Sequence, residues 1–434
     1  MGIAIKTSGT AVPITYPMRA VAKIATSRRR NMLDLLPREP QRYPISQLGH
    51  TRRGIYLISD PALVREIMVK RPNDFPKNDL FNAALEPLIG NGVFIADGEK
   101  WRHQRSHLEA AIKHLRTPVA RQHIEDAARD GFHGGGHMSD LAATFSHVTA
   151  DVMHRLLFGA PMEHASGQTL QSDFSQFQQH VGTLRLKTIL FQRAFTNVRQ
   201  PELASDVARK IRGYLLGQMK KALSEQQKIP SLTHLIHSHA PFNDPDMRDA
   251  WTLDQVAVFF LAGHETTAST LTWAAIQIAQ NNAWRDEWCA NEDGFRISLI
   301  KETMRMFPSG VFLPRVAAND TDLGGYTIKR GAMLLISPWT LHRHPRLWDS
   351  PLHFDPSRFL KGAPSVTAGS YLPFGMGART CIGGAFSFLE ADIILSHILD
   401  AFHLSIPEAN QIKPFAGLTL GADRPVAADL QIRQ

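Results

Sequence analysis

Cysteine is nearly absent from this chain of 434 residues, which contains only Cys289 and Cys381. Small secreted proteins that depend on disulfides contain several cysteine pairs. Two cysteines so far apart in the sequence argue against such a framework, and free thiols suit a reducing compartment. We therefore expect a cysteine in this chain to serve chemistry and not scaffolding.

Long apolar runs are also missing, because no stretch approaches roughly eighteen consecutive apolar residues, the length that a membrane-spanning helix needs. The opening residues lack the apolar core and the small-residue cleavage site of a signal peptide. We expect a cytoplasmic protein without a transmembrane segment. Segment 18–36 is basic and partly amphipathic, which predicts a solvated first helix, with contact to an anionic membrane as the alternative.

Charge of one sign is not extreme, since the formal net charge is +8. Arginine and lysine gather within residues 28–53 and 100–121. The sequence contains no zinc-finger spacing, basic zipper or aromatic RNA-binding motif, so nucleic acid is not an expected partner. The basic clusters fit an acidic protein partner better.

Several catalytic motifs begin in this sequence and are not completed. His264 and Glu265 start the zinc motif H-E-x-x-H, but position 268 is alanine, which excludes that metalloprotease class. No G-x-S-x-G nucleophile elbow, P-loop or complete dinucleotide fingerprint occurs. Any electrons that the protein uses must therefore come from outside the chain.

Helical periodicity dominates after about residue 100, and β-like runs occur at 52–59, 325–337 and near 418–434. The fold class is therefore mainly α with a small β-rich region. We expect one large domain over 1–434, with a flexible or basic N-terminal segment at about 1–40. A long buried helix is predicted to begin with a capping box of Thr252 and Gln255, and a polar cluster, 263–267, lies in its middle.

The stretch LPFGMGARTCIGGAF, residues 372–386, places Cys381 between two glycine-rich turns and ahead of a predicted helix at about 385–399. Helix N-termini and a nearby cation such as Arg379 favour a thiolate. Gly375, Gly377, Gly383 and Gly384 are expected to allow positive φ and a close approach of the backbone to a flat or bulky group. The pattern predicts a metal bond or nucleophilic attack, with an inert buried cysteine as the alternative.

Five residues of this loop match F-x-x-G-x-R-x-C-x-G without a departure: Phe374, Gly377, Arg379, Cys381 and Gly383. The chain thereby resembles the cytochrome P450 family. The resemblance implies the cytochrome P450 fold, built around a buried haem b. It implies that Cys381 is the axial thiolate ligand of the iron, that Phe374 packs near the sulfur and that Arg379 pairs with a haem propionate. A thiolate ligand pushes electron density toward the iron and favours O–O cleavage.

The polar cluster of the long helix carries a second part of the resemblance. Ala262, Gly263, Glu265 and Thr266 match [AG]-G-x-[DE]-T, which resembles the oxygen-activating groove of the family. The resemblance implies that Glu265 and Thr266 are catalytic and relay protons to dioxygen. We expect Thr266 to bond back to the carbonyl of Ala262 and the glycine to let dioxygen approach.

A third part is the pair Glu302 and Arg305, whose i, i+3 spacing sets both charges on one helix face. The family resemblance adds Arg358, giving a buried cluster that anchors the cysteine loop and has a structural role. Ser357 stands where the family usually has glutamate, which departs from the pattern.

The resemblance also assigns Trp101, Arg105 and Arg315 as donors to the haem propionates. Gly383 belongs to the same cofactor-binding set. The basic residues Arg102, Arg105, Lys113 and Arg116 are expected on the face that docks an acidic ferredoxin, or a flavodoxin, with its reductase.

The expected substrate pocket lies beneath segments 75–94 and 174–195 and includes Phe94, Ala262, Val311, Phe312 and Leu418. Its apolar lining predicts a hydrophobic small molecule: a terpenoid, steroid, fatty acyl chain or aromatic compound. The expected activity is a haem-thiolate monooxygenase that uses dioxygen. The alternatives are a haem-thiolate peroxygenase or isomerase, or a non-catalytic haem-binding protein.

Overall fold

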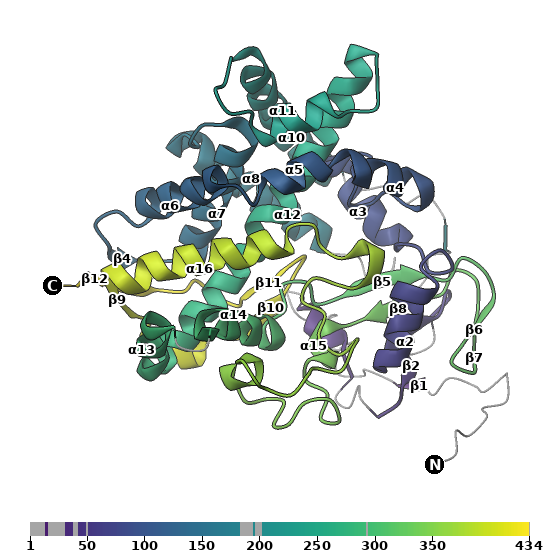
Figure 1. Ribbon diagram of the computed structural model, residues 1–434. Coiled ribbons are helices and arrows are strands. Elements are labelled where there is room, and N and C mark those ends of the chain that lie inside the picture. Colours follow the sequence, from purple (N-terminus) through teal and green to yellow (C-terminus); the bar gives the residue numbers. More distant parts are fainter. Residues whose placement is uncertain are drawn as a thin grey trace.

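The computed structural model describes residues 14–15, 31–37, 42–48, 51–182, 194–195, 202–291 and 294–433. Helices fill the top and the left side of Figure 1, and the largest sheet lies at the lower right. One large apolar core lies among the helices, and a smaller one lies against the main sheet. The predicted fold class, mainly α with a small β-rich region in a single domain, is confirmed.

The helices account for most of the described chain. They are α2 (Pro61–Arg65), α3 (Asp79–Ile89), α4 (Gly98–His107), α5 (Glu109–His114), α6 (Pro118–Gly131), α7 (Leu141–Phe158), α8 (His164–Gly182), α10 (Glu202–Ser224), α11 (Leu232–Ser238), α12 (Pro245–Gln280), α13 (Asn282–Ala290), α14 (Phe295–Met306), α15 (Pro338–Leu341) and α16 (Gly384–Ala401). Shorter turns are the π-helical Glu66–Lys70 and the 3₁₀ segments Met32–Leu35, Pro356–Phe359, Gly377–Arg379 and Ala409–Gln411.

Four small sheets join distant parts of the chain. The largest has the order β1 (Ile14–Thr15), β2 (Ile45–Leu48), β3 (Ile55–Ile58), β8 (Met333–Ile336) and β5 (Leu313–Val316). The others pair β4 (Gly136–Met138), β12 (Ala428–Ile432) and β9 (Phe402–Ser405); β6 (Thr321–Leu323) and β7 (Tyr326–Ile328); and β10 (Pro414–Ala416) and β11 (Leu420–Ala422). All three β-like runs of the sequence therefore contain strands.

The long central helix α12 exists as predicted, but the predicted capping box is wrong. The helix begins seven residues earlier, at Pro245, because the Asp244 side chain accepts from the Met247 N–H at 2.9 Å and proline suits the first helical position. Thr252 therefore lies inside the helix, where its hydroxyl donates to the Arg248 carbonyl. Gln255 instead accepts a hydrogen bond from Val93 at 3.0 Å.

Helices α7 and α12 pack closely where the polar cluster lies. A Cβ atom at Gly263 would come within 2.5 Å of the Met153 sulfur on α7. The glycine at this position therefore permits close helix packing, a role that the sequence analysis did not assign to it. The contact fixes α7 against the part of α12 that contains Glu265 and Thr266.

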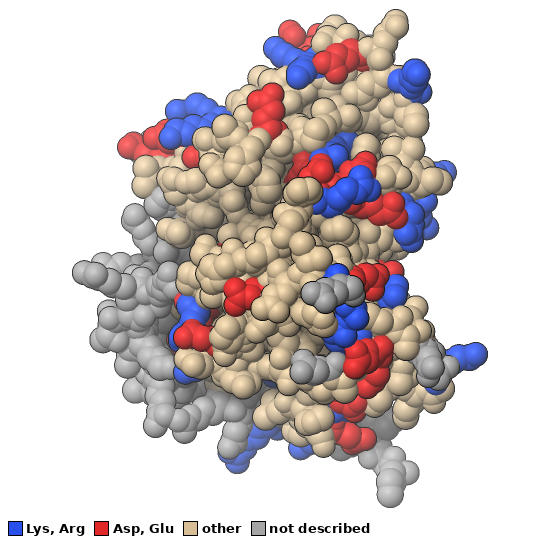
Figure 2. Space-filling view, turned by 90° about the vertical axis from the view of Figure 1, so that its left-hand side faces the viewer, with Lys and Arg blue, Asp and Glu red and all other residues tan. Residues whose placement is uncertain are grey.

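The surface shown in Figure 2 contains acidic and basic side chains in small mixed groups. The described residues on this face do not form the continuous basic surface that contacts with a nucleic-acid backbone use. Among the described residues no helix is both long and apolar enough to cross a membrane. Most of segment 1–40 lies outside the described residues, so its predicted flexibility and first helix remain predictions.

Candidate active site

A cavity of about 780 Å³ lies between α12 and the cysteine loop. Its walls include Cys381 and Phe374 from the loop, and Ala262 and Thr266 from α12. Most of the other lining residues are apolar. The two sequence motifs that lie more than one hundred residues apart therefore border one space.

The cysteine loop is shaped by its own backbone. Gly375 and Gly377 adopt φ values of +71° and +74°, and a Cβ at Gly377 would come within 2.5 Å of the Met68 carbonyl oxygen, so this position requires glycine. The Cys381 N–H donates to the Phe374 carbonyl at 3.0 Å, which closes the loop. The expected positive φ at Gly383 is wrong, because that residue has φ −85° as the N-cap of α16.

Opposing effects set the pKa of the Cys381 thiol. Burial raises the pKa of its thiol, while the backbone amides of Gly383 and Gly384 and the charge of Arg105 lower it, and the net pKa lies above its ordinary value. The helix N-terminus therefore acts in the predicted direction but is outweighed by burial, and the cation that lowers the pKa is Arg105, not the predicted Arg379. Coordination to a metal cation is the interaction that would hold this sulfur as a thiolate.

Three cations converge on one side of the cavity. Lys77, Arg315 and Arg379 all line it, and Lys77 forms a β-bridge with Arg315. Burial, together with the charges of Arg379 and Arg315, lowers the pKa of Lys77 to about 7, and burial beside Arg379 lowers that of Arg315 to about 10. The carboxylate nearby is Asp97, which bonds Arg379. Arg315 is buried and Lys77 and Arg379 are half-buried, and three cations facing one carboxylate create a site for further anions.

The early helix α4 supplies the other predicted donors. The Arg379 guanidinium carbon lies 4.2 Å from the centre of the Trp101 ring, so the indole and the guanidinium stack beside the cation site. Arg105 lines the cavity and is half-buried. The other three cations expected on or near the docking face, Arg102, Lys113 and Arg116, are exposed.

The α12 side of the cavity carries the predicted acid and alcohol. The Thr266 hydroxyl donates to the Ala262 carbonyl at 2.8 Å, as the motif implies. Glu265 also lines the cavity, and one of its oxygens accepts from the Ser146 hydroxyl on α7 at 3.2 Å. The carboxylate thus lies at the boundary between the cavity and α7.

The five predicted substrate-pocket residues all line the same cavity: Phe94, Ala262, Val311, Phe312 and Leu418. They come from the α3–α4 connection, α12, the connection between α14 and β5, and the β10–β11 hairpin. Much of the predicted roof segment 174–195 lies outside the described residues, although Gln178 and Val181 line the cavity.

The predicted charge cluster is present behind the cysteine loop. Arg305 forms two 2.7 Å hydrogen bonds with Glu302, both fully buried, and Arg358 lies 3.6 Å from the same carboxylate. The remaining Arg305 donors bond the carbonyls of His342, Pro351 and His353. Ser357 bonds Asp355 and takes no part in these contacts.

These residues fit a haem. The Cys381 thiol faces a large apolar cavity, and the cations at the edge of this cavity can bind anionic groups. The Phe374 ring packs against Gly384, where a Cβ atom would lie 3.3 Å from the ring. Lys77, Arg105, Arg315 and Arg379 are the side chains suited to two propionates. The arrangement can therefore hold a flat, apolar, dianionic cofactor by one sulfur.

The sequence pattern of the family "Cytochrome P450" matches residues 17–287 and 298–425. The chain therefore belongs to the cytochrome P450 family. It is a cytochrome P450 monooxygenase with a haem-thiolate cofactor, it uses dioxygen, and it depends on a redox partner.

Two curated relatives come from Streptomyces melanosporofaciens. Cyclooctatin synthase is 27% identical over 91% of this chain and 90% of its own length. Cyclooctat-9-en-7-ol 5-monooxygenase is 27% identical over 95% of this chain and 91% of its own length. Cytochrome P450 714B2 of Oryza sativa is 26% identical over 80% of this chain and 69% of the relative.

Solved structures show the same fold. The haem domain of cytochrome P450DA superposes with a TM-score of 0.79 at 20% identity, covering 98% of both chains. CYP175A1 of Thermus thermophilus superposes with a TM-score of 0.75 at 24% identity, covering 97% of this chain and all of that one.

Sequence reasoning missed Lys77, Asp97 and His264 as parts of the site. Lys77 is placed at the cation site by its β-bridge with Arg315 on β5, and Asp97 is placed there by its ion pair with Arg379. No local sequence pattern indicates either contact. Asp97 does carry the signal of a helix N-cap, because it directly precedes α4. His264 was visible as part of the polar cluster, but its ring contacts, with Phe260 and Glu265 on its own helix and with Phe174 on α8, could not be predicted from that pattern.

Proposed function

We propose that this monooxygenase hydroxylates a terpenoid, a largely hydrocarbon molecule held by burial, with electrons from a separate acidic ferredoxin. The observation that carries the proposal is the shared cavity, in which the Cys381 thiol and the Thr266 hydroxyl border an apolar space. One relative acts, by its name, on the unsaturated alcohol cyclooctat-9-en-7-ol. The apolar groups near Thr266, among them Val311 and Leu418, support a substrate of similar character.

The haem, when bound, supplies dioxygen activation and the electron-donating thiolate bond. The protein orients the substrate by apolar contact and excludes water from the cavity. In the structure Thr266 donates to its own helix, and rotation about its χ1 angle would turn the hydroxyl toward the cavity. We assign Glu265 and Thr266 the delivery of protons to the oxygen that leaves as water.

The proposed ferredoxin site uses the exposed cations Arg102, Lys113 and Arg116. Glu99 and Glu109 are exposed on the same two helices, so the positive surface is modest. Ferredoxin-dependent reduction should slow as ionic strength rises, and Lys113→Glu should slow it further at low salt. Lys221→Glu on α10 is the matched control. A salt-insensitive rate, or a faster rate with flavodoxin, would contradict the ferredoxin assignment.

The substrate class is tested by adding terpenoids, steroids, fatty acids and aromatic compounds to the purified ferric protein. Displacement of a water ligand appears as a low-spin to high-spin spectral change. The proposal expects terpenoids to give the tightest binding and a singly hydroxylated product labelled from ¹⁸O₂. Preference for fatty acids, or turnover with hydrogen peroxide faster than with reductant and dioxygen, would overturn it.

The proton-delivery role is tested with Thr266→Ala. Reductant consumption should continue while product falls several-fold and hydrogen peroxide is released. Thr266→Ser keeps the hydroxyl and should keep coupling. Thr272→Ala, which removes an equivalent helix-directed hydroxyl farther along α12, should behave as the unmodified protein. Unchanged coupling in Thr266→Ala would remove this residue from the relay.

A further inference from the structure

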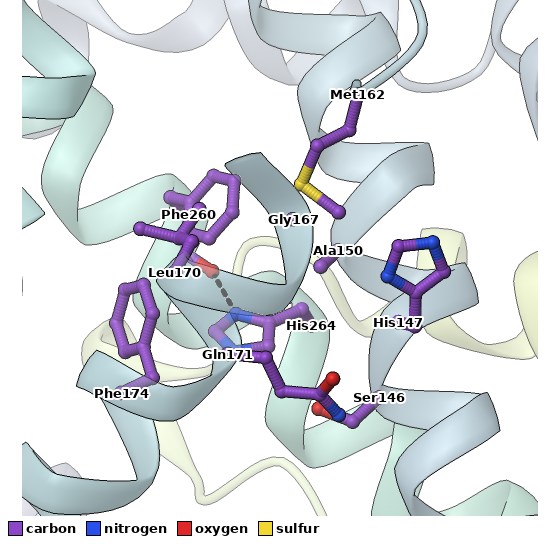
Figure 3. A pocket seen from close by; sticks show the side chains of 10 residues that line it. All are labelled: Ser146, His147, Ala150, Met162, Gly167, Leu170, Gln171, Phe174, Phe260 and His264. Atoms are coloured by element: carbon purple, nitrogen blue, oxygen red, sulfur yellow. Dashed lines mark hydrogen bonds between the residues drawn. The ribbon is translucent and has the colours of Figure 1, made fainter. Parts of the chain in front are cut away.

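His264, one residue before Glu265, is buried with 2% of its surface exposed. Its Nδ1 lies 2.6 Å from the Phe260 carbonyl oxygen, and Phe174 packs edge-on against the ring at 4.9 Å (Figure 3). A carbonyl oxygen can only accept a hydrogen bond. The Nδ1 atom therefore carries a proton in this geometry.

The other ring nitrogen faces an acid. His264 Nε2 lies 3.4 Å from Glu265 Oε1, the same oxygen that accepts from the Ser146 hydroxyl. Since Nδ1 is already protonated, Nε2 can hold a second proton only if the ring becomes an imidazolium, and Glu265 Oε1 is the acceptor that faces it. Burial raises the pKa of Glu265, but its contacts with His264, Gln178 and the Ser146 hydroxyl outweigh burial and leave the pKa below its ordinary value. That direction favours the carboxylate form of Glu265.

A second, small cavity adjoins this pair between α7 and α8. Its volume is about 10 Å³, close to the space that one water molecule needs. The polar residues around it are Ser146, His147, Gln171 and His264, which supply enough hydrogen-bonding groups for one water (Figure 3). Ala150 and Phe174 close its apolar side.

The polar lining continues to the protein surface. His147 is half-buried and lies 5.9 Å, ring to ring, from His164, which is exposed on α8. Burial lowers the pKa of His147 below its ordinary value, the charge of Asp151 on α7 opposes this only in part, and Glu265 on α12 is the other acid that faces this region. Protons can therefore enter from solvent without crossing the apolar substrate cavity.

Glu265 separates the two cavities, because it lines the large one while its partners Ser146 and His264 line the small one. We propose that His264 is a positioning residue that stores the proton that Glu265 delivers, and that one water in the small cavity restores this proton from solvent. The inference rests on the proposed role of Glu265 and Thr266. It assigns a function to a histidine that makes no contact with the substrate cavity in the described structure.

The proton balance is simple. The Nε2 proton moves to Oε1, which leaves a neutral imidazole protonated on Nδ1 and a neutral carboxylic acid. The acid passes its proton toward Thr266 and becomes a carboxylate again. Nε2 then takes a proton from the cavity water while that water takes one from solvent on the His147 side, so the water is restored and no hydroxide remains. No oxidation or reduction occurs in these steps.

The state of the ring is measured by NMR of ¹⁵N-histidine-labelled holoprotein in the diamagnetic ferrous carbon monoxide form at pH 7. We expect protons on both nitrogens of His264, with signals identified by their loss in His264→Gln. In Glu265→Gln the Nε2 proton should be lost. A ring with a bare Nε2 in the unmodified protein, or one unaffected by Glu265→Gln, overturns the inference.

His154 provides a matched control within the same spectra. Its Nδ1 also faces a backbone carbonyl, that of Ala160 at 2.7 Å, but its buried Nε2 has no hydrogen-bond partner among the residues that the structure describes. It should show one protonated nitrogen in every variant. These spectra require no turnover. They can therefore contradict the role of His264 while the monooxygenase proposal stands, and a protein without turnover can still give the expected spectra.

The water route is tested by filling the small cavity. Ala150→Val should slow exchange of the His264 Nε2 proton with solvent several-fold, and Ala143→Val on the exposed face of α7 should not. If Ala150→Val does not fold, Gly167→Ala serves, because its Cβ would come within 2.9 Å of the His147 ring. If the Nε2 proton of His264 exchanges at an unchanged rate in whichever of the two cavity-filling variants folds, the water route is overturned.

Discussion

His342 Nε2 accepts a hydrogen bond from the Leu372 N–H at 2.8 Å, directly at the start of the cysteine loop. Its Nδ1 bonds the Arg305 carbonyl at 3.1 Å, so the neutral ring links α14 to the loop. Burial, reinforced by the charges of Arg343 and Arg305, lowers the pKa of His342 to about 3. A protonated ring could not accept the Leu372 bond.

This bond predicts a loss of stability in acid. Above about pH 6.5 the ring is neutral in the folded and unfolded chains, and below that value only the unfolded chain takes up the proton. Each pH unit between 6.5 and 3 then lowers the free energy of unfolding by about 1.4 kcal/mol from this group. Urea unfolding of His342→Gln should show a correspondingly weaker pH dependence. The exposed His403→Gln should keep the original slope, and equal slopes for both variants would contradict the assignment.

The cation site predicts that haem retention depends on pH through Lys77. Haem propionates placed beside Lys77 raise the pKa of this lysine above about 7, so bound haem favours its protonated form. The attraction between lysine and propionate is lost as the pH rises through this raised pKa. Haem transfer to an excess of apoglobin should accelerate from pH 7 upward, by at most about tenfold per unit from this group. Lys77→Met should flatten the profile, and the exposed Lys70→Met should not. A profile unchanged by Lys77→Met would place the propionates elsewhere.

Arg305 uses all five of its N–H donors in buried contacts with Glu302 and three carbonyls. Lysine has only three donors and cannot bond the carboxylate with two parallel bonds. Arg305→Lys should therefore lower the free energy of unfolding of the holoprotein by about 3–5 kcal/mol, as expected when a buried pair is broken. Arg121→Lys, in the exposed pair with Glu125, should change it by about 1 kcal/mol or less. Equal losses would show that the cluster does not anchor the fold.

The sequence predicted best where function depends on local backbone chemistry. The positive φ angles of Gly375 and Gly377 and the hydrogen bond from Thr266 to Ala262 are set within a few residues, although the space at Gly377 is limited by the distant Met68. The start of α12 also has a local sequence pattern, because Asp244 is an N-cap residue followed by Pro245 at the first helical position. Thr252 and Gln255 match the pattern of an N-terminal capping box as well, although they lie inside the helix.

Contacts between distant segments could not be predicted in the same way. The pairing of Lys77 with Arg315 depends on sheet assembly, and that of Arg379 with Asp97 on the packing of α4. The role of Gly263 depends on which side chain α7 presents, and only the folded chain brings Met153 there. The small cavity beside His264 likewise exists only after α7, α8 and α12 have packed.

The most direct test of the account is the absorption spectrum of the reduced holoprotein with carbon monoxide. Thiolate coordination by Cys381 predicts the red-shifted Soret band in the unmodified protein and in Cys289→Ser, and its absence in Cys381→Ser. An unshifted band in the unmodified protein, or a red-shifted band that survives in Cys381→Ser, would contradict the assignment of the iron ligand.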